Sequence, residues 1–170
     1  MKKNSNFIII AISIITICLP SCSKSKNSPP PPCSTPSTCI VNTWYLKQDQ
    51  ENYNGSLVTI FTKGSNSNLN NNLDSAFWVF ASNNKWTGYA SPSVIFDAGT
   101  WEILPDNKTV IIHSGVPDTL SIINISSNAL SMSTTFNHNY PNSGAVVVAE
   151  ESGLDTAKLN GDISTFGTTP

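Results

Sequence analysis

Between Ile40 and Phe136 the chain alternates short runs of β-branched and aromatic residues with groups of Asn, Gly, Ser, Asp and Pro. The runs are typical of β-strands, and the residues between them favour turns. This alternation predicts an all-β domain. The expected strands are residues 40–49, 56–62, 76–82, 85–91, 93–104, 108–113, 118–126 and 128–136.

Three connections between these strands are short enough to be hairpins, namely Ser82–Asn84, Pro105–Asn107 and Ser126–Asn128. Each contains Asn, which tolerates the positive φ of tight turns, so the joined strands should be antiparallel. Residues 63–75 form one longer loop. Because eight strands joined in order can close on themselves and remove both sheet edges, we expect an eight-stranded antiparallel up-and-down β-barrel.

The period-2 pattern of the strands predicts which side chains point inward. Trp78 and Phe80 share one face of their strand, and Trp44 and Leu46 share one face of the first strand. An eight-stranded barrel holds either packed side chains or one small ligand, and both alternatives stay open at this point. The candidate interior residues that would line a ligand site are Trp78, Phe80, Trp86, Trp101, Ile112, Leu120 and Met132.

The N-terminus has the pattern of an export signal, because Lys2 and Lys3 precede an apolar run over residues 7–19. A helix of that length spans about 20 Å, which is short of the roughly 30 Å of a bilayer core. Residues 1–21 are therefore expected to be a signal peptide. The following Leu19-Pro20-Ser21-Cys22 resembles the bacterial lipobox, and this resemblance implies palmitate or a similar acyl chain on Cys22. The alternative is an ordinary secreted protein with Cys22 as a thiol.

Two further segments flank the expected barrel, which covers residues 39–137. Residues 22–38 contain four consecutive prolines and no aliphatic or aromatic side chain, so we expect an extended tether. Cys33 and Cys39 are candidates for a disulfide with each other in an oxidising compartment, and a disulfide to a partner is the alternative. The ring would lie mostly inside the tether, so we expect it to stabilise little of the fold. Residues 138–170 are expected to be an extension in which 145–149 adds a strand or 150–159 a short helix, followed by a flexible tail.

Composition excludes some functions. Without residues 1–21 the chain has seven Lys, no Arg and eleven acidic residues, so it lacks the basic surface of a nucleic-acid binder. No phosphate loop, nucleophile elbow or zinc motif occurs, so we expect no enzyme, no cofactor and no metal. Asp97 and Glu102 lie on opposite faces of their strand, which argues against a shared site, and His113 is expected at the surface.

The order of the motifs resembles the lipocalin-like (calycin-type) β-barrel domains of bacterial lipoproteins. The resemblance rests on residues 42–46 (NTWYL), on the hairpin 78–86 (WVFASNNKW), and on the second Gly-Thr-Trp motif at 99–104 (GTWEIL) with its hairpin to 108–112. It covers about 40–136. Asn42 replaces the usual first glycine, and no arginine is present to stack on Trp44, so the resemblance is to the small bacterial group and not to the vertebrate transport proteins.

The resemblance implies a fold more than a function. The first hypothesis is a lipid-anchored protein of the cell envelope whose barrel binds a small hydrophobic ligand. Ser23 is not the aspartate that retains lipoproteins at the inner membrane, so the outer membrane of a Gram-negative bacterium is favoured. The alternative is an envelope structural module, or one that contacts a protein or glycan through the 63–75 loop and Tyr45, Tyr53 and Tyr89 while its barrel is fully packed.

Overall fold

The computed structural model of the 170-residue chain describes residue 33 and residues 35–115, 117–135 and 152–170. The expected signal peptide, Cys22 and the apolar run 145–149 lie outside these residues. No helix in the described part of the chain is long and apolar enough to cross a bilayer.

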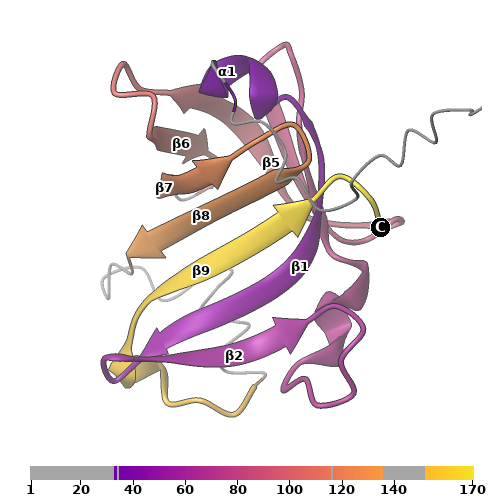
Figure 1. Cartoon of the computed structure of the whole chain (residues 1–170), viewed down its shortest axis with the longest axis vertical. Helices are drawn as coiled ribbons and strands as arrows, with labels where there is room; N and C mark the ends of the chain where they lie inside the picture. Colours follow the sequence, from indigo (N-terminus) through magenta and orange to yellow (C-terminus); the bar gives the residue numbers. More distant parts are fainter. Residues whose placement is uncertain (1–32, 34, 116, 136–151) are drawn as a thin grey trace, which may run out of the picture.

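Nine strands form one antiparallel sheet that closes on itself (Figure 1). Most strands begin and end within two residues of their expected bounds, and the all-β prediction is confirmed. The strands are β1 (Asn42–Tyr53), β2 (Ser56–Thr62), β3 (Phe77–Phe80), β4 (Lys85–Ser91), β5 (Val94–Ile103), β6 (Thr109–His113), β7 (Asp118–Ile125), β8 (Ala129–Thr135) and β9 (Leu159–Gly167).

Eight of these strands make the closed barrel, but they are not the eight that the sequence predicts. The closing strand is β9, which pairs with β8 on one side and with β1 on the other. Figure 1 shows it lying between these two strands. The prediction of a flexible tail is therefore wrong for Leu159–Gly167. A backbone paired along both edges has its hydrogen bonds satisfied, so this segment is an integral part of the fold.

The strand β2 extends the sheet at one corner instead of taking a place in the ring. One edge of β1 pairs with β3 through residues 42–45 and then with β2 through residues 48–53. The β1–β2 turn is Asn54-Gly55, and both residues have positive φ (52° and 80°), as a tight hairpin requires. The chain then crosses the 63–75 loop, whose last part is the short 3₁₀ helix η1 (Asn71–Ser75), and returns to β1 as β3.

The three predicted hairpins are confirmed as antiparallel pairs β3–β4, β5–β6 and β7–β8. Asn84 and Asn107 adopt positive φ (62° and 56°), as expected for Asn in such turns. The third turn is closed differently, because the Ser126 hydroxyl accepts the Ala129 backbone N–H at 3.1 Å. Two of the three turns thus use the left-handed conformation of Asn, and the third uses a serine side chain.

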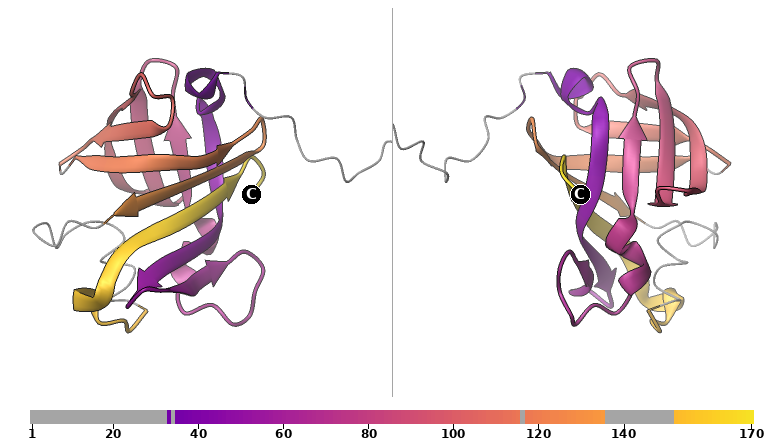
Figure 2. Two further views of the ribbon diagram at one scale, coloured as in Figure 1. Left: turned by 60° about the vertical axis from the view of Figure 1, so that its left-hand side comes forward. Right: turned by 90° about the vertical axis from the view of Figure 1, so that its right-hand side faces the viewer.

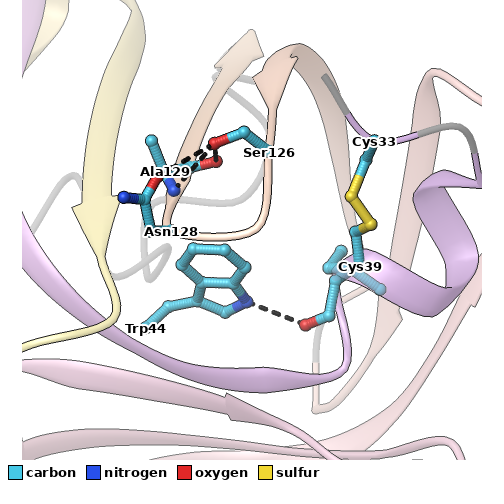
Figure 3. Close-up of a disulfide and its surroundings, with 7 residues drawn as sticks. Cys33, Cys39, Trp44, Ser126, Asn128 and Ala129 are labelled. Carbon is cyan, nitrogen blue, oxygen red and sulfur yellow. Dashed lines mark hydrogen bonds between the residues drawn. A yellow bond between two sulfur atoms is a disulfide. The ribbon is translucent and has the colours of Figure 1, made fainter. Parts of the chain in front are cut away.

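A short helix covers one end of the barrel, which we call the α1 end (Figure 2). Helix α1 (Pro36–Cys39) carries the disulfide between Cys33 and Cys39, and both cysteines pack against the hydrophobic core. The Trp44 indole N–H donates to the Ile40 carbonyl directly after this helix, at 2.8 Å. Figure 3 shows the Trp44 ring near the disulfide. The expectation that the disulfide ring lies in the tether is wrong, since the ring is part of the barrel's cover.

The opposite end of the barrel, which we call the far end, is where β1 stops and β9 begins. The second 3₁₀ helix η2 (Thr156–Lys158) leads into β9 there, and Figure 1 shows it at the opposite extreme from α1. The cross-strand registers place alternate side chains of every barrel strand inside. The interior at the α1 end is apolar, with Trp44, Val110 and Leu130 fully buried. The far end differs in chemistry.

Candidate functional site

The predicted interior tryptophans are inside the barrel and pack against one another. Trp78 is at the centre of this packing, with ring centroids 5.6 Å from Trp86 and 4.9 Å from Phe166. Phe80 meets Trp101 edge to face at 5.6 Å. Edge-to-face pairs at such separations are attractive, so these rings stabilise a filled layer across the barrel. Trp78 is half-buried, and the other predicted interior residues are buried, namely Phe80, Trp86, Trp101, Ile112, Leu120 and Met132.

A groove of about 500 Å³ lies at the α1 end, outside the barrel interior. It runs between α1 and the end of β5, and both polar and apolar residues line it, among them Ser37, Thr38, Asn84, Trp101 and Glu102. The other six predicted interior residues do not line this groove. The tryptophan layer is thus a packed core in the region where the sequence analysis placed a ligand.

Toward the far end the interior becomes acidic, because four strands each turn carboxylates inward. Glu51 on β1 is the cross-strand partner of Asp162 on β9. Asp118 on β7 pairs with the buried Ile112, and Asp97 on β5 pairs with Gly88 beside Trp86. Directly paired residues project to the same face, so all four point inward. With the buried Asp49 they form a group that we call the far-end acids, namely Asp49, Glu51, Asp97, Asp118 and Asp162.

Glu51 is fully buried, with 0% of its surface exposed. Neither of its carboxylate oxygens has a hydrogen-bond partner among the described residues. The pKa of Glu51 is raised to about 9, mainly by burial and in addition by the neighbouring charges of Asp162 and Asp49. At neutral pH Glu51 therefore holds its proton.

The other far-end acids share this environment. Burial is the main cause that raises the pKa of Asp49, and the Ser164 hydroxyl opposes it by donating to Asp49 Oδ1 at 3.0 Å. Burial raises the pKa of Asp162, and the charge of Asp49 adds to this effect. The pKa of Asp118 is raised by burial and then by the charge of Asp97. The charge of Asp49 thus raises the pKa of both Glu51 and Asp162, so the protonation of these three carboxyl groups is coupled.

A partly exposed aromatic ring borders the acids. Phe96 is 49% exposed, and its ring lies against Gly88 so closely that a Cβ at position 88 would collide with it. Trp86 meets Phe96 edge to face at 6.2 Å. The Trp86 indole N–H is buried and has no partner among the described residues. Two unpartnered buried polar groups, Glu51 and Trp86, therefore lie in the interior, where an unmade hydrogen bond costs about 1–3 kcal/mol.

Sequence reasoning assigned none of the far-end acids to a site, and it treated Asp97 and Glu102 as solvated charges. Asp97 and Glu102 were expected on opposite faces, and this is confirmed: Asp97 points inward, and Glu102 points outward to His113 at 3.0 Å. His113 is exposed at the surface, as expected. Asp49, Glu51, Asp118 and Asp162 were missed. Among the described residues no group of His, Cys, Asp or Glu has the arrangement of a metal site.

No family model matches the chain, and no curated protein sequence matches it significantly. The fold itself is an eight-stranded, closed, antiparallel β-barrel that is compatible with the lipocalin-like architecture.

Proposed function

We propose that this protein is a lipid-anchored, lipocalin-like barrel of the bacterial envelope that binds a small, largely hydrophobic ligand at the far end of its barrel. The lipobox-like Leu19–Cys22 supports the anchor at Cys22, and the proline-rich segment that follows supports a tether to the membrane. The role is binding, not catalysis. The outer membrane remains the favoured location.

The observation that carries the binding proposal is the buried, unpartnered carboxyl group of Glu51. Buried polar groups in proteins are nearly always hydrogen-bonded, and the exceptions concentrate where a ligand completes the partners. The unpartnered indole N–H of Trp86 supports the same interpretation in the same interior. Ligand sites typically combine apolar walls with a few polar groups of this kind.

The ring packing around Trp78 supports a ligand position above the tryptophan layer instead of within it. The packed layer then serves as an apolar floor. Trp86 connects the two regions, because it contacts Trp78 on one side and Phe96 near the acids on the other. A ligand at the far end would therefore change the fluorescence of Trp86.

The test is a fluorescence titration of the mature chain carrying Cys22→Ser, which keeps it free of lipid and detergent. Decanol is expected to shift the tryptophan emission in a saturable manner, and Trp86→Phe is expected to remove most of the shift. Trp101→Phe is the matched control, because Trp101 lies near the α1 end and donates to the Ala81 carbonyl. An unchanged spectrum with decanol, fatty acids and heme alike would overturn the binding proposal.

A second candidate function is the interaction module, and one observation favours it. Tyr45, Phe77 and Tyr89 form a row of rings on the outer face of β1, β3 and β4, with Phe77 and Tyr89 stacked at 4.4 Å. Tyr53 lies apart, beneath the Lys158 ammonium. Rows of outward aromatic rings are suited to contacts with a protein or a glycan. Tyr89→Ala would weaken such an interaction and leave decanol binding unchanged.

A further inference from the structure

The far-end acids lack a cationic counterpart in the described part of the chain. The ion pairs there are Lys63–Asp74, Lys158–Asp155 and His113–Glu102, and all of them involve half-exposed or exposed side chains elsewhere. The hydrogen-bonding side chain between the acids is Ser164, which donates to Asp49 and approaches Asp162 at 3.4 Å. Buried acids normally occur with paired charges, so this group is suited to a positive charge supplied from outside.

We infer that the ligand of this barrel is an organic cation, namely an amine with an apolar chain, whose ammonium group contacts Glu51, Asp162 and Asp49. This inference rests on the proposed binding function and names its ligand class. An ammonium group has three N–H donors and no acceptor, which matches a set of carboxylate oxygens in which both oxygens of Glu51 lack a partner. The described acids do not form a metal site, which favours an organic cation over a metal ion.

The position of the acids sets the orientation of the ligand. Glu51 is fully buried, whereas Phe96 is half-exposed and lies over Gly88 on the neighbouring part of the wall. The charged head is therefore inside, against β1 and β9, and the apolar chain runs past Phe96 toward solvent. The tryptophan layer beneath supplies the aromatic faces that attract ammonium groups.

Because the pKa of Glu51 is raised, amine binding should change the number of protons that the protein holds. An ammonium group favours the ionised carboxylate, so binding displaces the proton that Glu51 holds at neutral pH. Amine binding should therefore release protons, and calorimetry in buffers of different ionisation enthalpy would detect them. The charged groups that act on Glu51 are Asp162 and Asp49, and both raise its pKa. Burial also raises the pKa values of Asp49, Asp118 and Asp162.

The test compares three probes of equal chain length, decylamine, decanol and decanoate, by tryptophan fluorescence of the mature Cys22→Ser chain at pH 7.5. Decylamine is expected to bind about tenfold or more tightly than decanol, since hydrogen bonds to charged groups exceed neutral ones by this factor. Decanoate is expected to bind more weakly than decanol. Glu51→Gln should remove the preference for the amine, so that decylamine and decanol bind with similar affinity.

Glu102→Gln is the matched control, because Glu102 carries the same side chain on the outer face, and it should keep the preference. Asp162→Asn is a second variant that should weaken amine binding if Glu51→Gln fails to fold. Decanol binding without a preference for the amine, or a preference that survives both variants, overturns the inference and leaves the binding function intact. No binding of any of the three probes overturns both.

Discussion

Glu51 on β1 and Asp162 on β9 are directly opposed across the strand pair that closes the barrel, and both point into its interior. Their chain positions are 111 residues apart (162 − 51), so the pair exists only because β9 returns to β1. The same pairing that completes the fold thus brings the acids together. The single strand β9 therefore both closes the barrel and assembles the acids at the far end.

The first prediction is that the protein loses stability as the pH rises from 5 to 8. Below its ordinary pKa of 4.5, Glu51 is protonated in the folded and the unfolded state, whereas up to about pH 9 only the folded state keeps the proton. Each pH unit in this window lowers the free energy of unfolding by about 1.4 kcal/mol, so the loss from Glu51 by pH 7 is about 3 kcal/mol. Urea unfolding at pH 5 and pH 8 measures it.

Glu51→Gln should reduce this pH dependence and raise the stability at pH 8, because an amide has no proton to lose. The slope that remains comes from Asp49, Asp118 and Asp162, whose pKa values are also raised by burial. Glu102→Gln should leave the dependence of the free energy of unfolding on pH the same as in the wild type. Asp106, whose pKa is lowered by its hydrogen bond from Thr109, titrates below this window and does not contribute to it. A wild-type stability that rises between pH 5 and pH 8 would contradict the burial of Glu51.

The second prediction concerns the closing strand. Phe166 is 2% exposed, and its ring contacts Trp78 at 4.9 Å. Phe166→Ala should lower the free energy of unfolding by about 3–5 kcal/mol, which is a large part of the stability of a domain of this size. Thr169→Ala, at an exposed position beyond β9, should change it by less than about 0.5 kcal/mol. Equal effects of both variants in urea unfolding would mean that β9 does not close the barrel.

The third prediction concerns the disulfide at the α1 end. Replacing both Cys33 and Cys39 by Ser should lower the free energy of unfolding by about 2 kcal/mol, because the ring constrains the unfolded chain and holds α1 on the core. Emission from Trp44 should change as well, since its indole N–H is bonded to the Ile40 carbonyl at the end of α1. Unaltered stability and emission would place the ring outside the folded domain.

The fourth prediction concerns the anchor. In a Gram-negative host supplied with an alkyne analogue of palmitate, the full chain should take up the label and sediment with membranes, because of the lipobox-like sequence before Cys22. Cys22→Ser should lose both properties. Cys33→Ser is the control with a different cysteine removed, and it should keep the label. Labelling of the Cys22→Ser chain would exclude lipid attachment at this residue.

The sequence allowed most of the barrel to be predicted, because β1 and β3–β8 turn apolar side chains inward and Asn-containing turns separate many of them. It failed at β9 for a physical reason. The inward face of β9 carries Asp162, Ser164 and Phe166, while Ile163 is on the other face, so its pattern is the reverse of a normal core strand. Gly161 and Gly167 further weaken the strand signal.

The β1–β2 hairpin was detectable in the sequence and was not identified. Asn54-Gly55 is the strongest dipeptide signal for a two-residue turn, and it extends β1 to Tyr53. With β1 that long, Glu51 also falls within the strand, two residues after Asp49, and strand alternation would then predict whether the two acids point inward. The tryptophan layer was predicted correctly as interior, but whether its rings leave a space depends on ring packing, which the sequence pattern does not encode.

The far-end acids could not be found from sequence alone. Five carboxylates from four strands are scattered over more than 100 positions, and only the strand register brings them together. Each of them separately looks like a solvated surface charge. The one signal that the sequence offers for such a site is an acid at a position that strand alternation predicts to point inward. Asp97 is the example, because it lies two residues before Gly99 and therefore on the same face of its strand.

The most direct test of the far-end site is a carbon-13 NMR titration of the Glu51 carboxyl group, assigned by comparison with Glu51→Gln. The account predicts a pKa of about 9 for Glu51 in the unliganded protein, caused by its burial. It also predicts that saturating decylamine lowers this pKa. A Glu51 carboxyl group that titrates near its ordinary value of 4.5, with or without the amine, would contradict the account.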